Sequence, residues 1–273
     1  MSESQQALDG DPHVLYGAEE GVATITLDRP EKLNAVTFSM QTAFAKALDR
    51  AEADASLHAV VIRGNGRAFC AGVDLEDMAR HHGEFGHEAD AARIRAAALH
   101  WTKLWNLRKP VIVRAHGHCV GWGLEIALNA DIVLASEECR FHFPSIRIGT
   151  GLPDSAMAIY HLGLQWAKRM LLTGDAIDGR TAERIGLALM ALPEARLDDE
   201  VEILTRSLCE VPVDLLAESK AVLNRAVELM GRTQLQEFSE ISNATARRDP
   251  RVDAWNRSVT SQGSRATRDS DQA

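Results

Sequence analysis

Two glycine-rich segments have residue types and spacing that could bind a negatively charged oxygen. They are Gly66–Leu75 (GRAFCAGVDL) and His116–Glu125 (HGHCVGWGLE), and each lies between an expected strand and an expected helix. The first N–H groups of a helix have no partner within it, and glycine permits close approach of other groups. Two such donors form an oxyanion hole, in which each stabilises the charge by about 3 kcal/mol. We expect the N–H groups of Val73 and Trp122 to be these donors; the alternative is that the glycines only form tight turns.

Neither segment fits a nucleotide-binding motif. The second reads G-x-x-x-G-x-G, whereas the dinucleotide fingerprint is G-x-G-x-x-G, and the chain has no G-K-[ST] phosphate loop. These observations argue against an enzyme that uses a nicotinamide or a nucleoside triphosphate.

Composition limits the class of protein further. The 273 residues are 45% hydrophobic and 25% charged, which supplies a core and excludes disordered or fibrous chains. The net charge of −9 argues against nucleic-acid binding, which needs a basic surface. No apolar stretch reaches the ~18 residues of a membrane span, and the polar, acidic N-terminal residues do not resemble a signal peptide. We expect a cytoplasmic protein with no nucleic-acid or membrane partner.

Hydrophobic periodicity predicts strands followed by helices. An apolar helical face begins after Thr37 or Ser39, either of which could be its N-cap. Residues 75–108 are mostly helical in pattern, with an interruption at Gly83 and Gly86. The helical patterns toward the C-terminus are 201–231, broken at Pro212, and 234–247. The expected strands are 21–27, 59–63, 111–115, 131–135 and 139–143.

This order predicts an α/β fold with a helical C-terminal region. We assign residues 13–195 to the α/β core and residues 196–260 to the helical region. The polar segments 1–12 and 261–273 are expected to be flexible tails.

Several stretches carry motifs that occur in order over residues 14–245. They are Leu27–Ala35 (LDRPEKLNA), Arg67–Leu75 (RAFCAGVDL), Gly121–Glu125 (GWGLE), Ala130–Ala135 (ADIVLA), Leu171–Asp178 (LLTGDAID) with Ala182 and Gly186, and Lys220 after Pro212. In order and spacing these stretches resemble the enoyl-CoA hydratase/isomerase (crotonase) family.

The resemblance implies a spiral of β-β-α units whose C-terminal helices build a homotrimer, or a hexamer made of two trimers. It implies an acyl-CoA thioester substrate, so coenzyme A is part of the substrate and no tightly bound cofactor or metal is expected. The N–H groups of Val73 and Trp122 match the family's oxyanion donors. The residues expected to line the coenzyme A are Arg29, Lys32, Leu33, Ala35, Ala71, Gly72, Asp74, Leu75 and Gly121.

Glu125 is the candidate catalytic carboxylate. The family's hydratases use two glutamates to add water across a double bond, and Glu125 matches the first of them, three residues after Trp122. Its apolar neighbours Leu124 and Ile126 favour a buried carboxylate with a raised pKa. The alternative is a solvated surface glutamate.

The second glutamate of the family's hydratases is absent, because Ser145 occupies its place. A serine hydroxyl can hold a water molecule but cannot donate a proton as a carboxylic acid does. Loss of a positioned acid typically costs ~10²–10⁴ in rate. Asp154 could supply the acid, although it also suits the N-cap of a following helix.

Several functions stay open at this point. Hydration of a 2-enoyl-CoA is the first choice, and isomerisation or other enolate chemistry with Glu125 as a single proton shuttle is the second. A weakly active protein that binds CoA esters is the third. A metalloprotein is remote, because His116 and His118 lie on a tight loop and do not suggest a shared metal site. The remaining candidates, His81, His82 and His87, fall in a glycine-interrupted loop.

Overall fold

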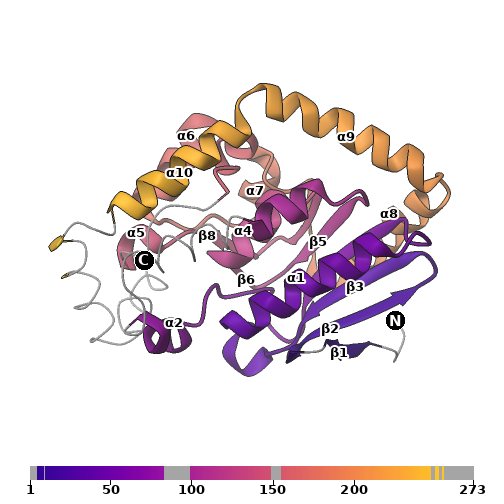
Figure 1. The fold of residues 1–273 in the computed structure, drawn as a ribbon, viewed down its shortest axis with the longest axis horizontal. Helices are drawn as coiled ribbons and strands as arrows, with labels where there is room; N and C mark the ends of the chain where they lie inside the picture. Colours follow the sequence, from indigo (N-terminus) through magenta and orange to yellow (C-terminus); the bar gives the residue numbers. More distant parts are fainter. Residues whose placement is uncertain are drawn as a thin grey trace.

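The computed structural model describes residues 5–8, 10–82, 99–148, 155–246, 250, 251 and 254. Within them a seven-stranded sheet has the order β1-β2-β3-β4-β5-β7-β9, and β6 and β8 form a second sheet (Figure 1). The strands are β1 (Gln6–Leu8), β2 (Asp11–Glu19), β3 (Val22–Leu27), β4 (Ala59–Gly64), β5 (Val111–Ala115), β6 (His118–Val120), β7 (Ile132–Ser136), β8 (Arg140–His142) and β9 (Met190–Leu192).

Helices flank this sheet and form the C-terminal region. Residues 99–106 are also helical. No helix among the described residues is long and apolar enough to cross a membrane. The helices are α1 (Phe38–Ala53), α2 (Leu75–His82), α4 (Trp122–Asn129), α5 (Ser145–Ile148), α6 (Ala158–Thr173), α7 (Gly179–Ile185), α8 (Leu197–Cys209), α9 (Val213–Leu229) and α10 (Arg232–Ala246), with short 3-10 helices η1 (Pro30–Lys32) and η2 (Glu194–Arg196).

The chain repeats a unit of strand, short strand and helix. β5, β6 and α4 form one unit, and β7, β8 and α5 form the next. Neighbouring units align in parallel, since β5 pairs with β7 and β6 pairs with β8. A parallel bridge between Cys70 and Cys119 extends the second layer to the loop after β4. The predicted α/β class and its β-β-α spiral are therefore confirmed.

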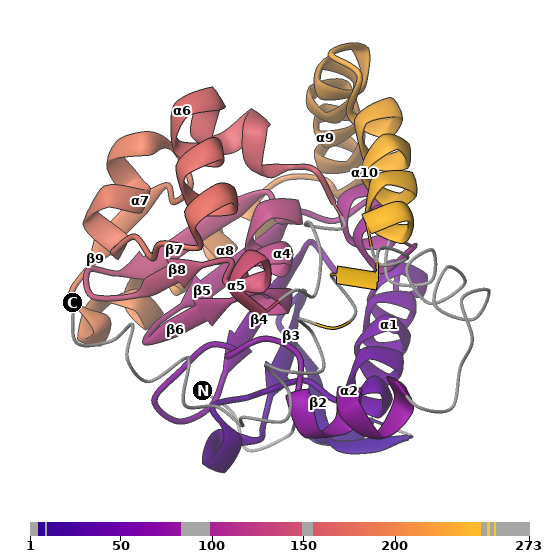
Figure 2. The same ribbon diagram turned by 90° about the vertical axis from the view of Figure 1, so that its left-hand side faces the viewer.

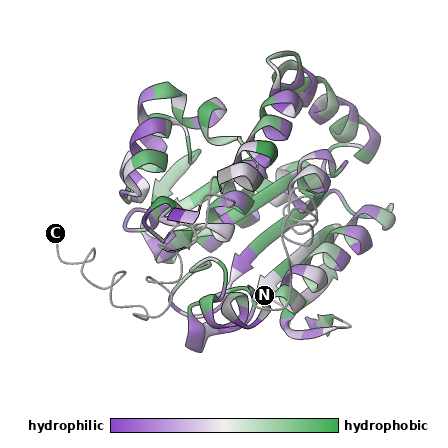
Figure 3. Cartoon of the chain, turned by 60° about the vertical axis from the view of Figure 1, so that its left-hand side comes forward, coloured by the Kyte–Doolittle hydropathy of each residue, from purple (hydrophilic) through white to green (hydrophobic). Residues whose placement is uncertain are grey.

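The central strands are buried on both faces, and their alternate residues enter two hydrophobic clusters. Val60 and Ile62 of β4 join the larger cluster, which includes α1 and α4. Val61 faces the other way and packs with Leu197 of α8. This alternation follows from the two-residue period of a strand, and Figure 3 shows hydrophobic colour concentrated along these strands. α8 therefore covers one face of the sheet, and α1 and α4 pack on the other face.

The N-cap and the buried face of α1 agree with the prediction from the sequence. The side chain of Thr37, not that of Ser39, caps the helix by accepting a hydrogen bond from the N–H of Met40 at 3.2 Å. Phe44 and Leu48, one turn apart, are fully buried. An N-cap hydroxyl and an apolar stripe act within one or two turns of the chain, so they are readable from sequence.

The expected loose tail at residues 1–12 is wrong in part. Gln6–Leu8 forms β1 and Asp11 begins β2, and the two strands pair antiparallel. The side chain of Thr26 in β3 also donates a hydrogen bond to Gln5 at 2.9 Å. Gln5 and β1 are therefore held by their contacts with β3 and β2, and their own sequence pattern does not predict a strand. Six further elements were not predicted from the sequence: β2, β6, β9, α5, α6 and α7. The tail at 261–273 lies outside the described residues.

A partly buried ion pair ties α9 to the core: the side chain of Lys220 is 7% exposed and that of Asp131 is 21% exposed. The ammonium of Lys220 donates to Asp131 at 2.7 Å and to the carbonyl of Lys109 at 3.1 Å. The same carboxylate oxygen of Asp131 accepts the N–H of Val111 at 2.7 Å. Burial lowers the pKa of Lys220 and raises the pKa of Asp131, while their mutual attraction opposes both shifts.

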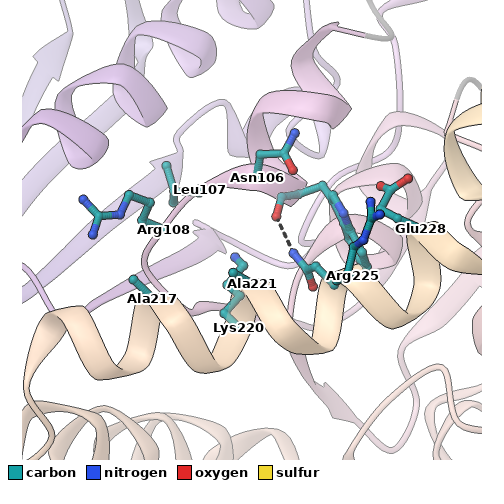
Figure 4. A pocket seen from close by; sticks show the side chains of 10 residues that line it. Asn106, Leu107, Arg108, Ala217, Lys220, Ala221, Arg225 and Glu228 are labelled. Atoms are coloured by element: carbon teal, nitrogen blue, oxygen red, sulfur yellow. Dashed lines mark hydrogen bonds between the residues drawn. The ribbon is translucent and has the colours of Figure 1, made fainter.

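The ammonium of Lys220 lies at a pocket of about 200 Å³ between α9 and residues 105–108 (Figure 4). Asn224 closes this contact by donating to the carbonyl of Trp105 at 2.9 Å, which is the dashed line in the figure. Residues of the two glycine-rich segments do not line this pocket. The pocket therefore belongs to the attachment of α9.

We predict that Lys220→Met destabilises the fold by about 2 kcal/mol, because it removes a hydrogen bond between two charged groups and leaves the partly buried carboxylate of Asp131 without its ammonium partner. The free energy of unfolding from urea titrations followed by circular dichroism measures this. Arg206→Ala is the control, since Arg206 forms an exposed pair with Glu202 and exposed pairs contribute little. Equal midpoints for Lys220→Met and the wild type would contradict a structural role for the pair.

Candidate active site

The two glycine-rich segments meet at Gly72 and Gly121. Both residues have positive φ, 95° and 51°, which side chains disfavour. A Cβ atom on Gly72 would lie 3.2 Å from the carbonyl oxygen of Val120 and 3.9 Å from the Cα of Gly121. The backbone positions just before Val73 and Trp122 are therefore in contact.

The N–H groups of Val73 and Trp122 are not used in the local hydrogen bonds. Val36 forms a parallel bridge with Val73, through the carbonyl of Gly72 and the N–H of Asp74. In such a bridge the N–H of Val73 itself points away from Val36. Trp122 is the first residue of α4, where an N–H has no acceptor in the helix. Among the described residues, no hydrogen bond from either N–H is observed.

Asn34 holds the loop that leads to Gly72. Its side chain is fully buried and its backbone is left-handed, with φ of 57°. Its amide nitrogen contacts the carbonyls of Asn65, Ala68 and Phe69 at 2.9, 2.8 and 3.2 Å. Its amide oxygen accepts the N–H of Arg29 at 2.8 Å. One asparagine therefore satisfies several buried carbonyls of the loop, a role that the sequence analysis missed.

His116 fastens the same loop from the other segment. Arg114 donates to Nδ1 of His116 at 2.8 Å. Because a guanidinium can only donate, Nδ1 accepts and the Nε2–H donates to the carbonyl of Gly66 at 2.8 Å. Burial lowers the pKa of His116, which agrees with a neutral ring. The carbonyl of His116 also accepts the N–H of Phe69 at 2.8 Å, so His116 is structural.

Glu125 is buried and has a defined partner. Only 2% of its surface is exposed, which excludes the solvated alternative. It lies one turn after Trp122 on α4. The hydroxyl of Ser155 donates to Oε2 of Glu125, and the N–H of Ser155 lies 3.5 Å from Oε1. The sequence analysis missed Ser155, whose only signal was its place before the helix now seen as α6.

The indole of Trp122 packs into an aromatic cluster. Its ring centroid lies 5.0 Å from that of Phe44 and 5.3 Å from that of Trp101. Trp122 is only 5% exposed. Its side chain therefore anchors the start of α4, while its backbone N–H is the group available at the glycine contact.

The two segments expected to line coenzyme A lie against each other. Leu33 has left-handed φ of 52°, and its carbonyl accepts the N–H of Ala71 at 2.9 Å. Arg29 donates to Asp74 at 2.6 Å and to the carbonyl of Ala35 at 3.0 Å. The charges of Arg29 and Asp74 are therefore engaged with each other.

Asp74 also stabilises the first turn of α2. Its carboxylate accepts the N–H groups of Glu76 and Asp77 at 2.9 Å. Lys32 is half-exposed and lies 3.5 Å from Glu76 at the surface. Leu75, which opens α2, is 38% exposed. Of these residues, Lys32 is the cation that stands nearest to solvent.

Ser145 begins α5 and is half-buried. It follows β8, whose last residue His142 accepts the N–H of Gly121 at 3.1 Å, so the chain leading to Ser145 lies beside the glycine contact. Asp154 lies outside the described residues. Its expected role as the N-cap of the following helix is wrong, because Met157 is the N-cap of α6.

Two of the histidine candidates from residues 81–87 lie among the described residues. His81 and His82 end α2, and His87 lies outside the described residues. Across the described ranges, no group of three or more His, Cys, Asp or Glu residues could hold a metal ion.

Sequence comparison finds enoyl-CoA hydratases among the relatives of this chain. The sequence model of the enoyl-CoA hydratase/isomerase family matches residues 17–254. A probable enoyl-CoA hydratase of Mycobacterium tuberculosis is 30% identical over 217 residues, which is 79% of this chain and 82% of the relative. The 2,3-dehydroadipyl-CoA hydratase of Escherichia coli K12 is 30% identical over 218 residues, or 77% and 81% of the two chains.

Solved structures agree with these relatives. An enoyl-CoA hydratase from Mycobacterium smegmatis superposes with a TM-score of 0.86 at 31% identity, over 97% of this chain and 95% of the other. An enoyl-CoA hydratase/isomerase from Xanthobacter autotrophicus Py2 gives a TM-score of 0.81 at 32% identity, over 86% and 87%.

We predict that Asn34→Ala destabilises the fold by about 2 kcal/mol, because it leaves buried carbonyls of the loop without a donor and places alanine at a left-handed position. Urea unfolding of the purified variant tests this. Asn106→Ala, which changes an exposed asparagine, should leave the midpoint unchanged. A wild-type midpoint for Asn34→Ala would show that the loop does not depend on this side chain.

Proposed function

Because the chain belongs to the enoyl-CoA hydratase/isomerase family, we propose that it is a 2-enoyl-CoA hydratase with Glu125 as its base. The observation that carries the proposal is the buried carboxylate of Glu125 one helical turn after Trp122, beside the contact of Gly72 and Gly121. The arrangement provides a base next to two N–H groups that can receive one oxygen.

In the proposed reaction, Val73 and Trp122 donate their N–H groups to the thioester oxygen. Glu125 removes a proton from water as the water oxygen bonds to Cβ, and the electron pair of the double bond moves onto the thioester oxygen. The enolate formed is stabilised by the two N–H donors. Because Trp122 is the first residue of α4, the partial positive charge at the N-terminus of this helix also stabilises the enolate oxygen. Return of a proton to Cα, from Glu125 or through water, completes the addition.

A second candidate is isomerisation of a 3-enoyl-CoA. It is favoured by Ser145, because a hydroxyl is a poor substitute for the second acid of a hydratase. Glu125 would remove a proton from C2 and return it to C4, which moves the double bond into conjugation with the thioester. The same oxyanion hole stabilises the intermediate enolate in both reactions. Hydration adds the oxygen of water to Cβ, whereas isomerisation only moves a proton from C2 to C4.

We propose that coenzyme A lies along residues 29–35 and 71–75. Their mutual hydrogen bonds and the bridge of Val36 with Val73 support a single continuous edge. Lys32, rather than Arg29, is the cation proposed to meet the phosphates, because Arg29 is already engaged by Asp74. Coenzyme A enters as part of the substrate and leaves with the product.

We predict that Glu125→Gln lowers kcat for the preferred enoyl-CoA by ~10²–10⁴, because the amide cannot take a proton. The assay follows the absorbance of 2-enoyl-CoA and 3-enoyl-CoA esters of several chain lengths. Glu183→Gln, an exposed change on α7, should keep wild-type activity. Loss of 2-enoyl absorbance supports hydration, and gain of it from 3-enoyl-CoA supports isomerisation. Full activity of Glu125→Gln would remove Glu125 from the mechanism.

We further propose that α9 and α10 join copies of this chain into a trimer or a hexamer. Large hydrophobic side chains on these helices are exposed, and contiguous apolar surface usually marks an interface. Both views place the two helices at the periphery (Figures 1 and 2). The exposed large hydrophobic residues of α9 and α10, together with Met230 in the connection between them, are Leu215, Val222, Leu223, Leu229, Met230, Leu235, Phe238 and Ile241.

We predict that Phe238→Asp shifts the protein to smaller assemblies, because it places a charge in an apolar interface. Light scattering after size exclusion should give three or six times the 29.9 kDa chain mass for the wild type. Leu172→Asp on α6 alters a side chain that is equally exposed, 65% against 66%, and should leave the assembly intact. An unchanged mass for Phe238→Asp would place the interface elsewhere.

A further inference from the structure

We propose that Ser155 is a positioning residue, which fixes the carboxylate of Glu125 for proton transfer by hydrogen bonding to both of its oxygens. The inference rests on the proposed function, in which Glu125 is the base. It concerns a residue that neither the family motifs in the sequence nor the reaction chemistry singles out.

The geometry assigns each donor of Ser155 to a different oxygen. The hydroxyl lies on Oε2 and the backbone N–H lies 3.5 Å from Oε1. An N–H can only donate, and hydrogen-bond donors on both oxygens stabilise a carboxyl group in its ionised form. A carboxylate has about four acceptor sites, so these two bonds orient it without using its whole capacity. Ser155 therefore favours Glu125 in the state that a base requires.

Burial increases the importance of the hydrogen bonds between Ser155 and Glu125. Ser155 is 0% exposed and Glu125 is 2% exposed, so bulk water does not replace a donor that is lost. A buried carboxylate is stable only with hydrogen-bonding partners. Because Ser155 and Glu125 lie 30 residues apart on different elements, their bond also ties the segment before α6 to α4.

The hydroxyl of Ser155 does not serve as a helix cap. Met157 is the N-cap of α6, and the cap has no side-chain hydrogen bond. The start of α6 is instead held by burial, since Met157 and Ala158 are 1% and 2% exposed. Ala156 has φ of 53°, a left-handed backbone that costs energy for any residue with a Cβ. Strain beside a functional group is typical of sites where position matters more than stability.

The test uses Ser155→Ala, with Ser155→Cys as a second variant that keeps the volume but offers only a weak donor. Ser207→Ala is the matched control, because Ser207 is exposed on α8 and bonds only within its own helix. Infrared spectra of carboxyl-labelled protein first identify the band of Glu125 as the one lost in Glu125→Gln. We expect this band to shift in both Ser155 variants and to stay in place in Ser207→Ala.

Kinetics give the second measurement. We expect Ser155→Ala to lower kcat about tenfold to a hundredfold, the effect of losing a hydrogen bond to a charged group, with KM changed less than about threefold. In the Glu125→Gln background the same change should cost little more, because Ser155 acts through Glu125.

Two results would overturn the proposal. One is a Glu125 band that is the same in the wild type and both Ser155 variants. The other is an equal loss of kcat from Ser155→Ala with and without Glu125. If the wild type acts on no enoyl-CoA ester, the proposed function fails, but the infrared comparison still decides whether Ser155 holds Glu125.

Discussion

The close approach of two backbone segments at Gly72 and Gly121 is the constraint on which the rest of the site depends. A Cβ on Gly72 would lie only 3.2 Å from the carbonyl of Val120, and both glycines have a positive φ that disfavours a side chain. The approach continues at Gly117, where a Cβ would lie 2.0 Å from the carbonyl of Arg67. Glycine is required here for space between backbones. The contact sets where the N–H groups of Val73 and Trp122 stand.

Hydrogen bonds to buried side chains make this contact rigid. Asn34 and His116 each bind carbonyls of the loop from 65 to 69, and neither is expected to touch a substrate. Glu125 is held in the same way by Ser155. A buried polar group without a partner costs about as much as several exposed contacts contribute. The site is therefore positioned by residues that the chemistry itself does not use.

The C-terminal helices have a different relation to the core. α8 lies on the open face of the sheet and completes its hydrophobic layer, whereas α9 is attached through Lys220 and Asp131. The apolar residues that α9 and α10 leave exposed face away from both hydrophobic clusters. α8 thus stabilises the single chain, whereas α9 and α10 present an apolar surface suited to contact with further copies of it.

The sequence by itself determined what local chemistry controls: the buried strands, the cap at Thr37, the glycines before Val73 and Trp122, and the inward Glu125, whose neighbours are apolar. Tertiary structure alone decided the pairing of Gln6–Leu8, the bond from Ser155 to Glu125 and the engagement of Arg29 by Asp74. Periodicity, caps and turns act over a few residues, so they can be predicted from residues that are neighbours in the sequence. A hydrogen bond between residues 30 or 45 positions apart exists only once the fold brings them together.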